Sequence, residues 1–160
     1  MRSIVSLTLF IAVLSGLYFI NRDYLQPAMN VQKLSIPSAL SKDLKVSKLR
    51  VAVIGDLHVG DSLKEYDALS ALLKNVIQSE PDLVLLLGDY TASPGSISNM
   101  AFHRAELARR LAALTVLPVF AVLGNYETNS GLEGWQDTLL EADIPVLQNS
   151  ITKTNYCLVC

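Results

Sequence analysis

The sequence contains little cysteine, and what it has lies at the end of the chain. Only two cysteines occur in 160 residues, at Cys157 and Cys160. Their C-x-x-C spacing fits either a redox or zinc half-site or two apolar residues in a terminal strand. Because there is no second cysteine pair, the sequence argues against a redox or zinc site and favours the second interpretation.

An excess of positive charge is also absent. The 13 Lys and Arg residues are outnumbered by 15 Asp and Glu, which gives a formal net charge of -2 and a pI near 5.6. We therefore do not expect a surface that binds nucleic acid by neutralising phosphates. Internal repeats and low-complexity tracts are missing as well. Hydrophobic residues make up 51% of the chain and charged residues 18%, which suits one globular core and an additional apolar segment.

The additional apolar segment lies at the N-terminus, where Ile4 to Ile20 contains no charged residue. As a helix this segment is roughly 25 Å long, at the short end for crossing a bilayer. An uncleaved anchor over residues 1–21, a cleaved signal and a buried core helix are the three interpretations. Bulky residues after Ser15-Gly16 argue against cleavage, so the anchor is favoured. We expect a single-pass protein held in a lipid bilayer, with its domain on the extracytoplasmic side.

Two further segments follow the apolar one. Residues 22–47 are polar and broken by Pro27 and Pro37, which is typical of a tether followed by an edge strand. Residues 48–160 alternate apolar runs with helical spacing and predict an α/β domain, with a mostly parallel sheet and flanking helices. The predicted strands are Leu49 to Ile54, Leu83 to Leu87, Val119 to Leu123, Pro145 to Leu147 and Tyr156 to Val159. The predicted helices are Ser62 to Ser79, Asn99 to Leu114 and Leu132 to Ala142.

Three of these strands are followed by polar loops that each begin with glycine, which lets the backbone turn sharply. The loops are Gly55-Asp56-Leu57-His58, Gly88-Asp89-Tyr90 and Gly124-Asn125-Tyr126-Glu127. In a parallel sheet the crossovers return every strand in one direction, so residues just past the strand ends gather along one edge. We therefore expect four side chains to converge: Asp56, His58, Asp89 and Asn125. Their oxygen and nitrogen ligands suit Mn, Fe, Zn or Mg.

A purely structural alternative is that Asp56, Asp89 and Asn125 cap helices after the strands. Helix caps do not require His58 two residues after Asp56, so metal binding is favoured. The other histidine, His103, has no partner residue at a suitable spacing. We expect it to be a partly exposed helical residue rather than a metal ligand.

The three loops resemble the motifs of the calcineurin-like metallophosphoesterases, which are D-x-H, G-D and G-N-H-[DE], followed by G-H and G-H-x-H. The loops match the first three motifs in order, except that Tyr126 stands in the histidine place of the third. The resemblance extends from about Lys48 to Leu147, and the last two motifs are missing because no histidine follows His103. It implies half of an α/β/β/α sandwich, so that residues 48–160 form a C-terminally truncated metallophosphoesterase domain.

The resemblance also implies a chemistry, the hydrolysis of phosphomonoester or phosphodiester bonds with two divalent metal ions. Asp89 would bridge the two ions, Asp56 and His58 would hold the first, and Asn125 the second. Tyr126 takes the place of a catalytic histidine. A phenol ionises at about pH 10, so Tyr126 would hydrogen-bond a phosphate oxygen more readily than it would transfer a proton. The remaining residues of the motifs would support the loops: Gly55, Gly88, Gly124 and Glu127.

Two functions from different classes remain open. The first is a membrane-anchored, metal-dependent phosphoesterase that is complete only in a longer form of the protein, because the missing histidines leave roughly half of the site. The second is a non-catalytic, anchored remnant or interaction module with the same half-domain. Metal binding and hydrolysis of a phosphate ester would separate the two.

Overall fold

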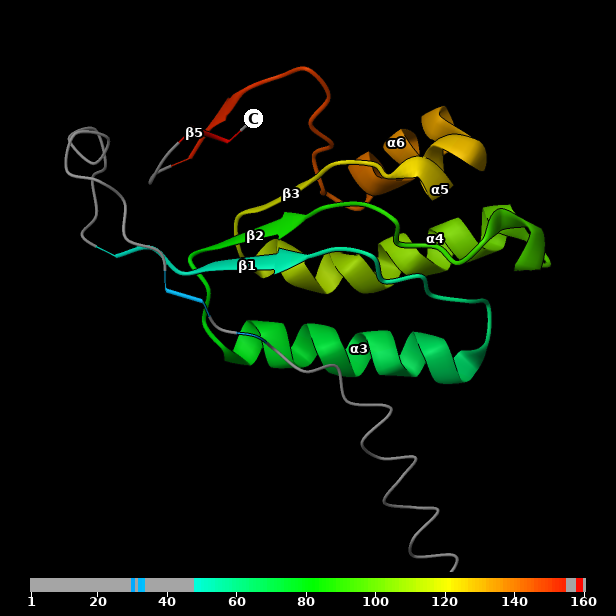
Figure 1. The fold of residues 1–160 in the computed structure, drawn as a ribbon, viewed down its shortest axis with the longest axis horizontal. Coiled ribbons are helices and arrows are strands. Elements are labelled where there is room, and N and C mark those ends of the chain that lie inside the picture. Colours follow the sequence, from blue (N-terminus) through cyan, green and yellow to red (C-terminus); the bar gives the residue numbers. More distant parts are fainter. Residues whose placement is uncertain (1–29, 31, 34–47, 155–157, 160) are drawn as a thin grey trace, which may run out of the picture. The chain divides into compact units, whose positions relative to one another are not determined.

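The computed structural model describes residues 30, 32, 33, 48–154, 158 and 159. The chain divides into two compact units, Met1–Leu34 and Ser35–Cys160, and every described helix and strand belongs to the second. The strands are β1 (Val51–Ile54), β2 (Leu83–Leu86), β3 (Val119–Ala121), β4 (Thr152–Lys153) and β5 (Leu158–Val159) (Figure 1). The helices are α3 (Leu63–Gln78), α4 (Met100–Leu111), α5 (Asn125–Asn129) and α6 (Leu132–Glu141), with short 3₁₀ helices η1 (Pro94–Ser96) and η2 (Ala112–Val116).

The first three strands form a parallel sheet in the order β1-β2-β3. Each of them is an apolar run, and each is followed by a helix that returns the chain to the starting end of the sheet. The predicted α/β fold with a parallel sheet and flanking helices is confirmed. The two-residue strands β4 and β5 pair separately and antiparallel.

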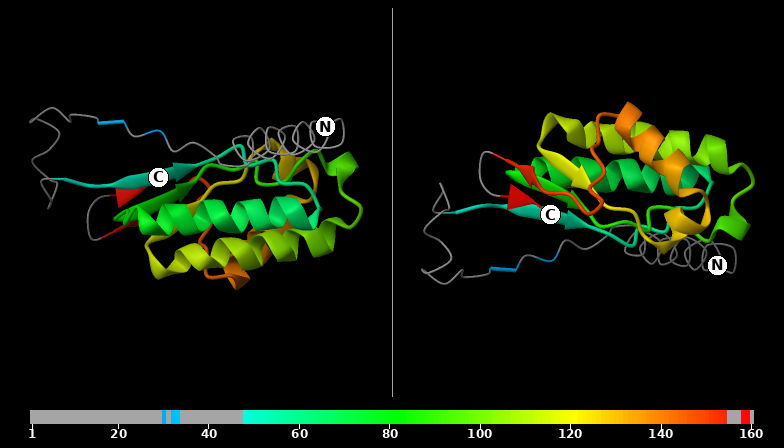
Figure 2. Two further views of the ribbon diagram at one scale, coloured as in Figure 1. Left: turned by 90° about the horizontal axis from the view of Figure 1, so that it is seen from below. Right: turned by 90° about the horizontal axis from the view of Figure 1, so that it is seen from above.

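One face of the parallel sheet packs against the helices. Ile54, Leu86 and Ala121 are paired across the three strands, and all three side chains are buried in the core. Figure 2 shows α3 and α4 lying side by side along the sheet, and the two helices contact each other. The helical side chains of the same core are Tyr66, Leu69, Leu73, Val76, Leu107, Ala108, Leu111, Trp135 and Leu139.

The opposite face of the sheet is apolar and partly open. Side chains alternate between the faces of a strand, so the next paired row, Val53, Leu85 and Phe120, points away from the helices. Val53 is 59% exposed, and Leu87 just beyond β2 is 52% exposed. A sheet with one apolar face left open is consistent with half of a sandwich.

The start of α3 is fixed by contacts that also hold the first site loop. Ser62 caps the helix, because its Oγ accepts a hydrogen bond from the Glu65 N–H at 3.3 Å. The Glu65 carboxylate accepts a hydrogen bond from the Gly60 N–H at 3.1 Å and another from the Ser62 hydroxyl. The chain that follows His58 is therefore tied to the first turn of α3.

Several element boundaries differ from the sequence prediction. The second predicted helix, Asn99 to Leu114, divides into α4 and η2, which ends at Val116. Residues 145–147 form only an isolated bridge between Val146 and Ala121. Helix α5 was not predicted, because its five residues are too few to show helical periodicity in the sequence.

The predicted anchor at 1–21, and all but residues 30, 32 and 33 of the predicted tether at 22–47, lie outside the described residues. Among the residues that the structure describes, no helix combines the length and the apolar character needed to span a bilayer. Membrane anchoring and an extracytoplasmic domain remain predictions.

Candidate metal centre

Three of the predicted ligands come together at the carboxyl ends of β1 and β2. Asp56, His58 and Asp89 each offer a ligand atom, and these atoms lie within 4.8 Å of one another. Asp56 Oδ1 lies 3.7 Å from His58 Nε2. Asp56 and His58 are exposed and Asp89 is half-buried, so the group faces solvent along one side. Two carboxylates this close repel each other unless a cation lies between them, and the oxygen and nitrogen ligands fit a divalent ion.

The backbone at all three residues adopts the left-handed region. The φ angles of Asp56, His58 and Asp89 are 52°, 44° and 52°, a conformation that costs about 1–2 kcal/mol for a residue with a Cβ. Backbone hydrogen bonds hold it, with the Asp56 N–H donating to the Gly88 carbonyl at 3.1 Å and the His58 N–H to the Asp89 carbonyl at 3.0 Å. The fold thus maintains a strained geometry that turns the ligands toward one point, which is typical of functional sites.

Glycine is required where the second and third loops touch. Gly88 has a φ of +89°, and a Cβ on it would lie 2.4 Å from the Gly124 nitrogen. A Cβ on Gly124 would lie 2.1 Å from Asp89 Oδ1. Only two glycines allow the backbones to approach this closely, and this approach brings Asp89 against the loop that contains Asn125.

We expect Gly88→Ala to lower the free energy of unfolding by at least about 2 kcal/mol, because a forced overlap and a strained φ both add cost. Urea denaturation measures the effect. Gly95→Ala is the matched control, since a Cβ there meets no atom within 4 Å. Equal stability of the two variants would contradict the close approach at Gly88.

Glu127 joins the second loop to the third. Its buried carboxylate accepts four backbone hydrogen bonds. Oε2 takes the N–H of Asp89 at 2.8 Å and of Gly124 at 2.9 Å. Oε1 takes the N–H of Tyr90 at 2.9 Å and of Thr91 at 3.2 Å. The carboxylate thereby fixes the backbone of Asp89 and of the two residues that follow it.

Tyr126 lies against the ligand group. Its ring contacts the His58 imidazole edge to face, with 4.9 Å between ring centroids and 67° between planes. Its backbone N–H donates to Asp89 Oδ1 at 3.1 Å. Asn125, the first residue of α5, is exposed and lies between this residue and Gly124. The third loop therefore brings Tyr126 next to Asp89, and Asn125 precedes Tyr126 in the chain.

His103 corrects one expectation. Instead of being partly exposed on its helix, the side chain is fully buried. Burial lowers the pKa of the imidazole below its usual 6.5, although the carboxylates of Asp61 and Glu65 and the Val59 carbonyl act in the opposite direction. The sequence did contain the signal, because His103, Leu107, Leu111 and Leu114 recur at helical spacing and all four are buried.

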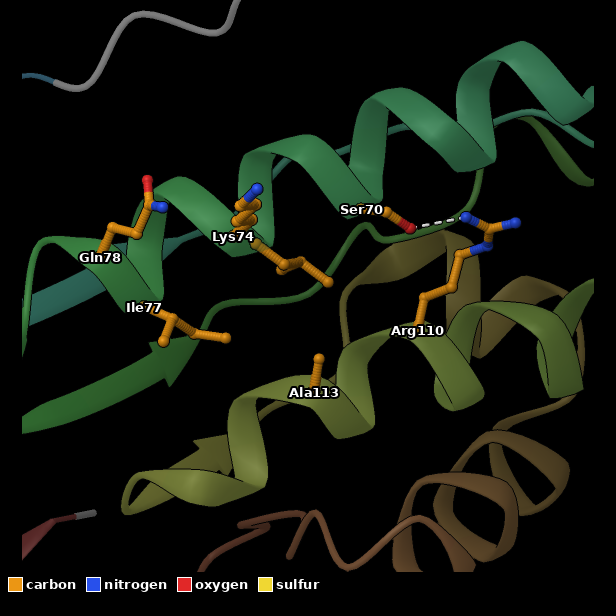
Figure 3. A pocket seen from close by; sticks show the side chains of 7 residues that line it. Ser70, Lys74, Ile77, Gln78, Arg110 and Ala113 are labelled. Carbon is orange, nitrogen blue, oxygen red and sulfur yellow. Dashed lines mark hydrogen bonds between the residues drawn. The ribbon is translucent and has the colours of Figure 1, made fainter.

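A surface cavity of about 190 Å³ lies apart from the ligand group, in the groove between α3 and the end of α4. Figure 3 shows Lys74 and Ile77 on one side and Arg110 on the other, with Arg110 hydrogen-bonded to Ser70. None of the predicted site residues lines this cavity. The candidate metal site is therefore separate from this groove.

Comparisons with known proteins agree with the motifs. The calcineurin-like phosphoesterase family model matches residues 49–158. An uncharacterized metallophosphoesterase from Aquifex aeolicus (strain VF5) is 31% identical over 152 residues, which are 94% of this chain and 54% of that protein. The crystal structure of the Pseudomonas putida nuclease MPE is 22% identical with a TM-score of 0.43, and the match covers 61% of this chain and 47% of that one.

The matched region contains all three motif loops and the strands that precede them. The chain spans about half the length of the curated relative that it matches. From the family match and the identity to the Aquifex aeolicus protein, the chain belongs to the calcineurin-like phosphoesterase family.

Proposed function

We propose that this chain forms part of a phosphoesterase that hydrolyses phosphomonoester or phosphodiester bonds with two divalent metal ions. The observation that carries the proposal is the convergence of Asp56, His58 and Asp89, whose ligand atoms lie within 4.8 Å of one another. Family membership supports the same chemistry. The open side of the ligand group leaves room for a phosphate-ester substrate.

Each residue has a distinct part in this proposal. The Asp89 loop is hydrogen-bonded to both of the other loops. Asp89 would bridge the two ions, Asp56 and His58 would hold the first, and Asn125 would hold the second. When bound, two divalent ions activate water and offset the charge that develops on the phosphoryl oxygens. The N–H of Tyr126 fixes Asp89 Oδ1 and thereby orients the carboxylate toward Asp56 and His58.

The Tyr126 side chain is proposed to bind substrate. Its ring packs against His58, so its hydroxyl belongs to the same loop cluster as the ligands. The Tyr126 phenol can donate a hydrogen bond to a phosphoryl oxygen, and it replaces the imidazole that general-acid catalysis most often uses. Substrates with good leaving groups are therefore favoured.

The whole protein's activity needs ligands beyond those of this chain. The resemblance implies that histidines of the two later motifs complete both metal positions, and no histidine follows His103 in this sequence. We propose that a longer form of the protein supplies them. The competing function is a non-catalytic, anchored remnant or interaction module of the same fold, which the tyrosine in the place of the catalytic histidine favours.

Two measurements on the full 160-residue chain test the proposal. Calorimetric titration with Mn²⁺ reports binding, and release of nitrophenolate from bis(p-nitrophenyl) phosphate reports hydrolysis. We expect saturable Mn²⁺ binding by this chain, and hydrolysis that is slow in this chain, faster in a longer form with the later histidines, and stopped in both when EDTA removes the metal. Binding without hydrolysis in the longer form would favour the non-catalytic module, and no binding by this chain would overturn the assignment of Asp56, His58 and Asp89 as metal ligands.

A further inference from the structure

A buried chain of polar side chains links two helices to the loop that contains Asp89. The side chains are Tyr66 of α3, His103 of α4 and Thr91, which follows β2, and each residue is at most 2% exposed. The Tyr66 hydroxyl lies 2.6 Å from His103 Nδ1, and His103 Nε2 lies 3.1 Å from Thr91 Oγ1. The proposed function uses none of these side chains.

The directions of these hydrogen bonds follow from the last member of the chain. The Thr91 hydroxyl donates to the Ala92 carbonyl at 3.1 Å, so its oxygen accepts from His103. His103 Nε2 therefore has the proton, and Nδ1 accepts from the Tyr66 hydroxyl. The imidazole is neutral in one defined tautomer, in agreement with the lowering of its pKa by burial.

The end of this chain lies within the backbone that positions the metal ligands. The Thr91 N–H donates to Glu127 Oε1 at 3.2 Å, two residues after Asp89. The Ala92 N–H donates to the Val59 carbonyl at 2.8 Å, one residue after His58. Movement of Thr91 would therefore disturb the attachment of both loops, and the His103 side chain opposes that movement.

We propose that His103 is a positioning residue for the metal centre, which holds the segment from Asp89 to Ala92 in its ligand-presenting conformation through Thr91. The Tyr66 hydroxyl holds the His103 imidazole in place and so connects α3 to the same chain of hydrogen bonds. The part of this inference that concerns metal affinity rests on the proposed function, whereas the anchoring of the loop is a property of the metal-free chain. The two parts can be measured separately.

The first readout is amide hydrogen exchange of the full chain without metal. Thr91→Val removes the hydroxyl and keeps the shape of the side chain, so we expect the amides of Tyr90 and Thr91 to exchange about tenfold faster or more. The amide of Leu73 in α3 should be unchanged. Thr91→Ser keeps the hydroxyl and should retain protection.

The second readout is the Kd for Mn²⁺, measured by calorimetry on the same variants. Groups that position metal ligands typically contribute 10- to 100-fold in affinity, and we expect a loss of about tenfold in His103→Leu and Thr91→Val. His103→Gln retains a donor near the Nε2 position and should recover most of the affinity. Leu73→Ala, a buried change in α3 away from the loops, controls for general destabilisation.

The outcomes distinguish the two hypotheses. If the unmodified chain binds no Mn²⁺, the proposed function is wrong, and loop exchange alone then decides whether His103 anchors the segment. Unchanged exchange at Tyr90 and Thr91 in Thr91→Val would overturn the inference, whatever the metal affinity. The inference would also be overturned if Leu73→Ala weakened Mn²⁺ binding as much as Thr91→Val does. The loss of affinity would then result from general destabilisation and not from movement of the Asp89 loop.

Discussion

Asp89→Asn is expected to reduce Mn²⁺ affinity and metal-dependent hydrolysis by about a thousandfold or more. The substitution removes the charge of the residue assigned to bridge the two ions, and metal ions contribute several kcal/mol of charge stabilisation at such sites. The fold should survive. The asparagine side-chain oxygen can still accept the hydrogen bond that Asp89 Oδ1 receives from the Tyr126 N–H, and the Asp89 N–H still donates to Glu127.

Asp82→Asn provides the matched control, because Asp82 precedes β2 whereas Asp89 follows it. Asp82 Oδ2 accepts a hydrogen bond from the Arg50 N–H at 2.8 Å, and an asparagine can keep that bond. We expect Asp82→Asn to bind Mn²⁺ like the unmodified chain. A similar decrease in both variants would mean that loss of negative charge anywhere on the domain weakens binding, and the assignment of Asp89 would be wrong.

Glu127→Gln is expected to lower the free energy of unfolding by about 3 kcal/mol. Each carboxylate oxygen of Glu127 accepts hydrogen bonds from two backbone N–H groups. In glutamine one of these oxygens becomes an NH₂ group, which cannot accept a hydrogen bond, so two backbone N–H groups lose their acceptor. Each buried donor left without a partner costs about 1–3 kcal/mol. Urea denaturation monitored by the fluorescence of Trp135 measures the change.

Glu141→Gln makes the same chemical change at an exposed position on α6 and should alter stability by less than about 0.5 kcal/mol. The Glu127 variant should also bind Mn²⁺ more weakly, because the Asp89 backbone is no longer fixed. If Glu127→Gln is as stable as Glu141→Gln, the four backbone hydrogen bonds to the Glu127 carboxylate do not form in solution.

The sequence was most informative where chemistry and strand pattern coincide. Aliphatic runs followed by Gly-Asp or Gly-Asn predicted the parallel strands and the edge at which they end. The structure brings Asp56, His58 and Asp89 together there, because parallel strands end on the same side of a sheet.

Other features depend on contacts between distant segments and were not accessible in this way. Helix α5 is only five residues long. The N–H of its N-cap, Gly124, donates to Glu127, and the N–H of Tyr126 donates to Asp89. The four hydrogen bonds to Glu127 include three from the loop after β2, which no local pattern reveals. His103 was predictable as buried from its spacing to Leu107 and Leu111, but its contacts with Tyr66 and Thr91 were not.

The most direct test of the metal centre is the position of the metal itself. Crystals of the full chain grown with Mn²⁺ should give an anomalous difference peak beside Asp56, His58 and Asp89, at about 2.0–2.3 Å from His58 Nε2 and at least one oxygen of each carboxylate. A second peak on the far side of Asp89, next to Asn125, would support the two-ion arrangement. Peaks found only elsewhere on the molecule, with these three side chains free of metal, would contradict the account.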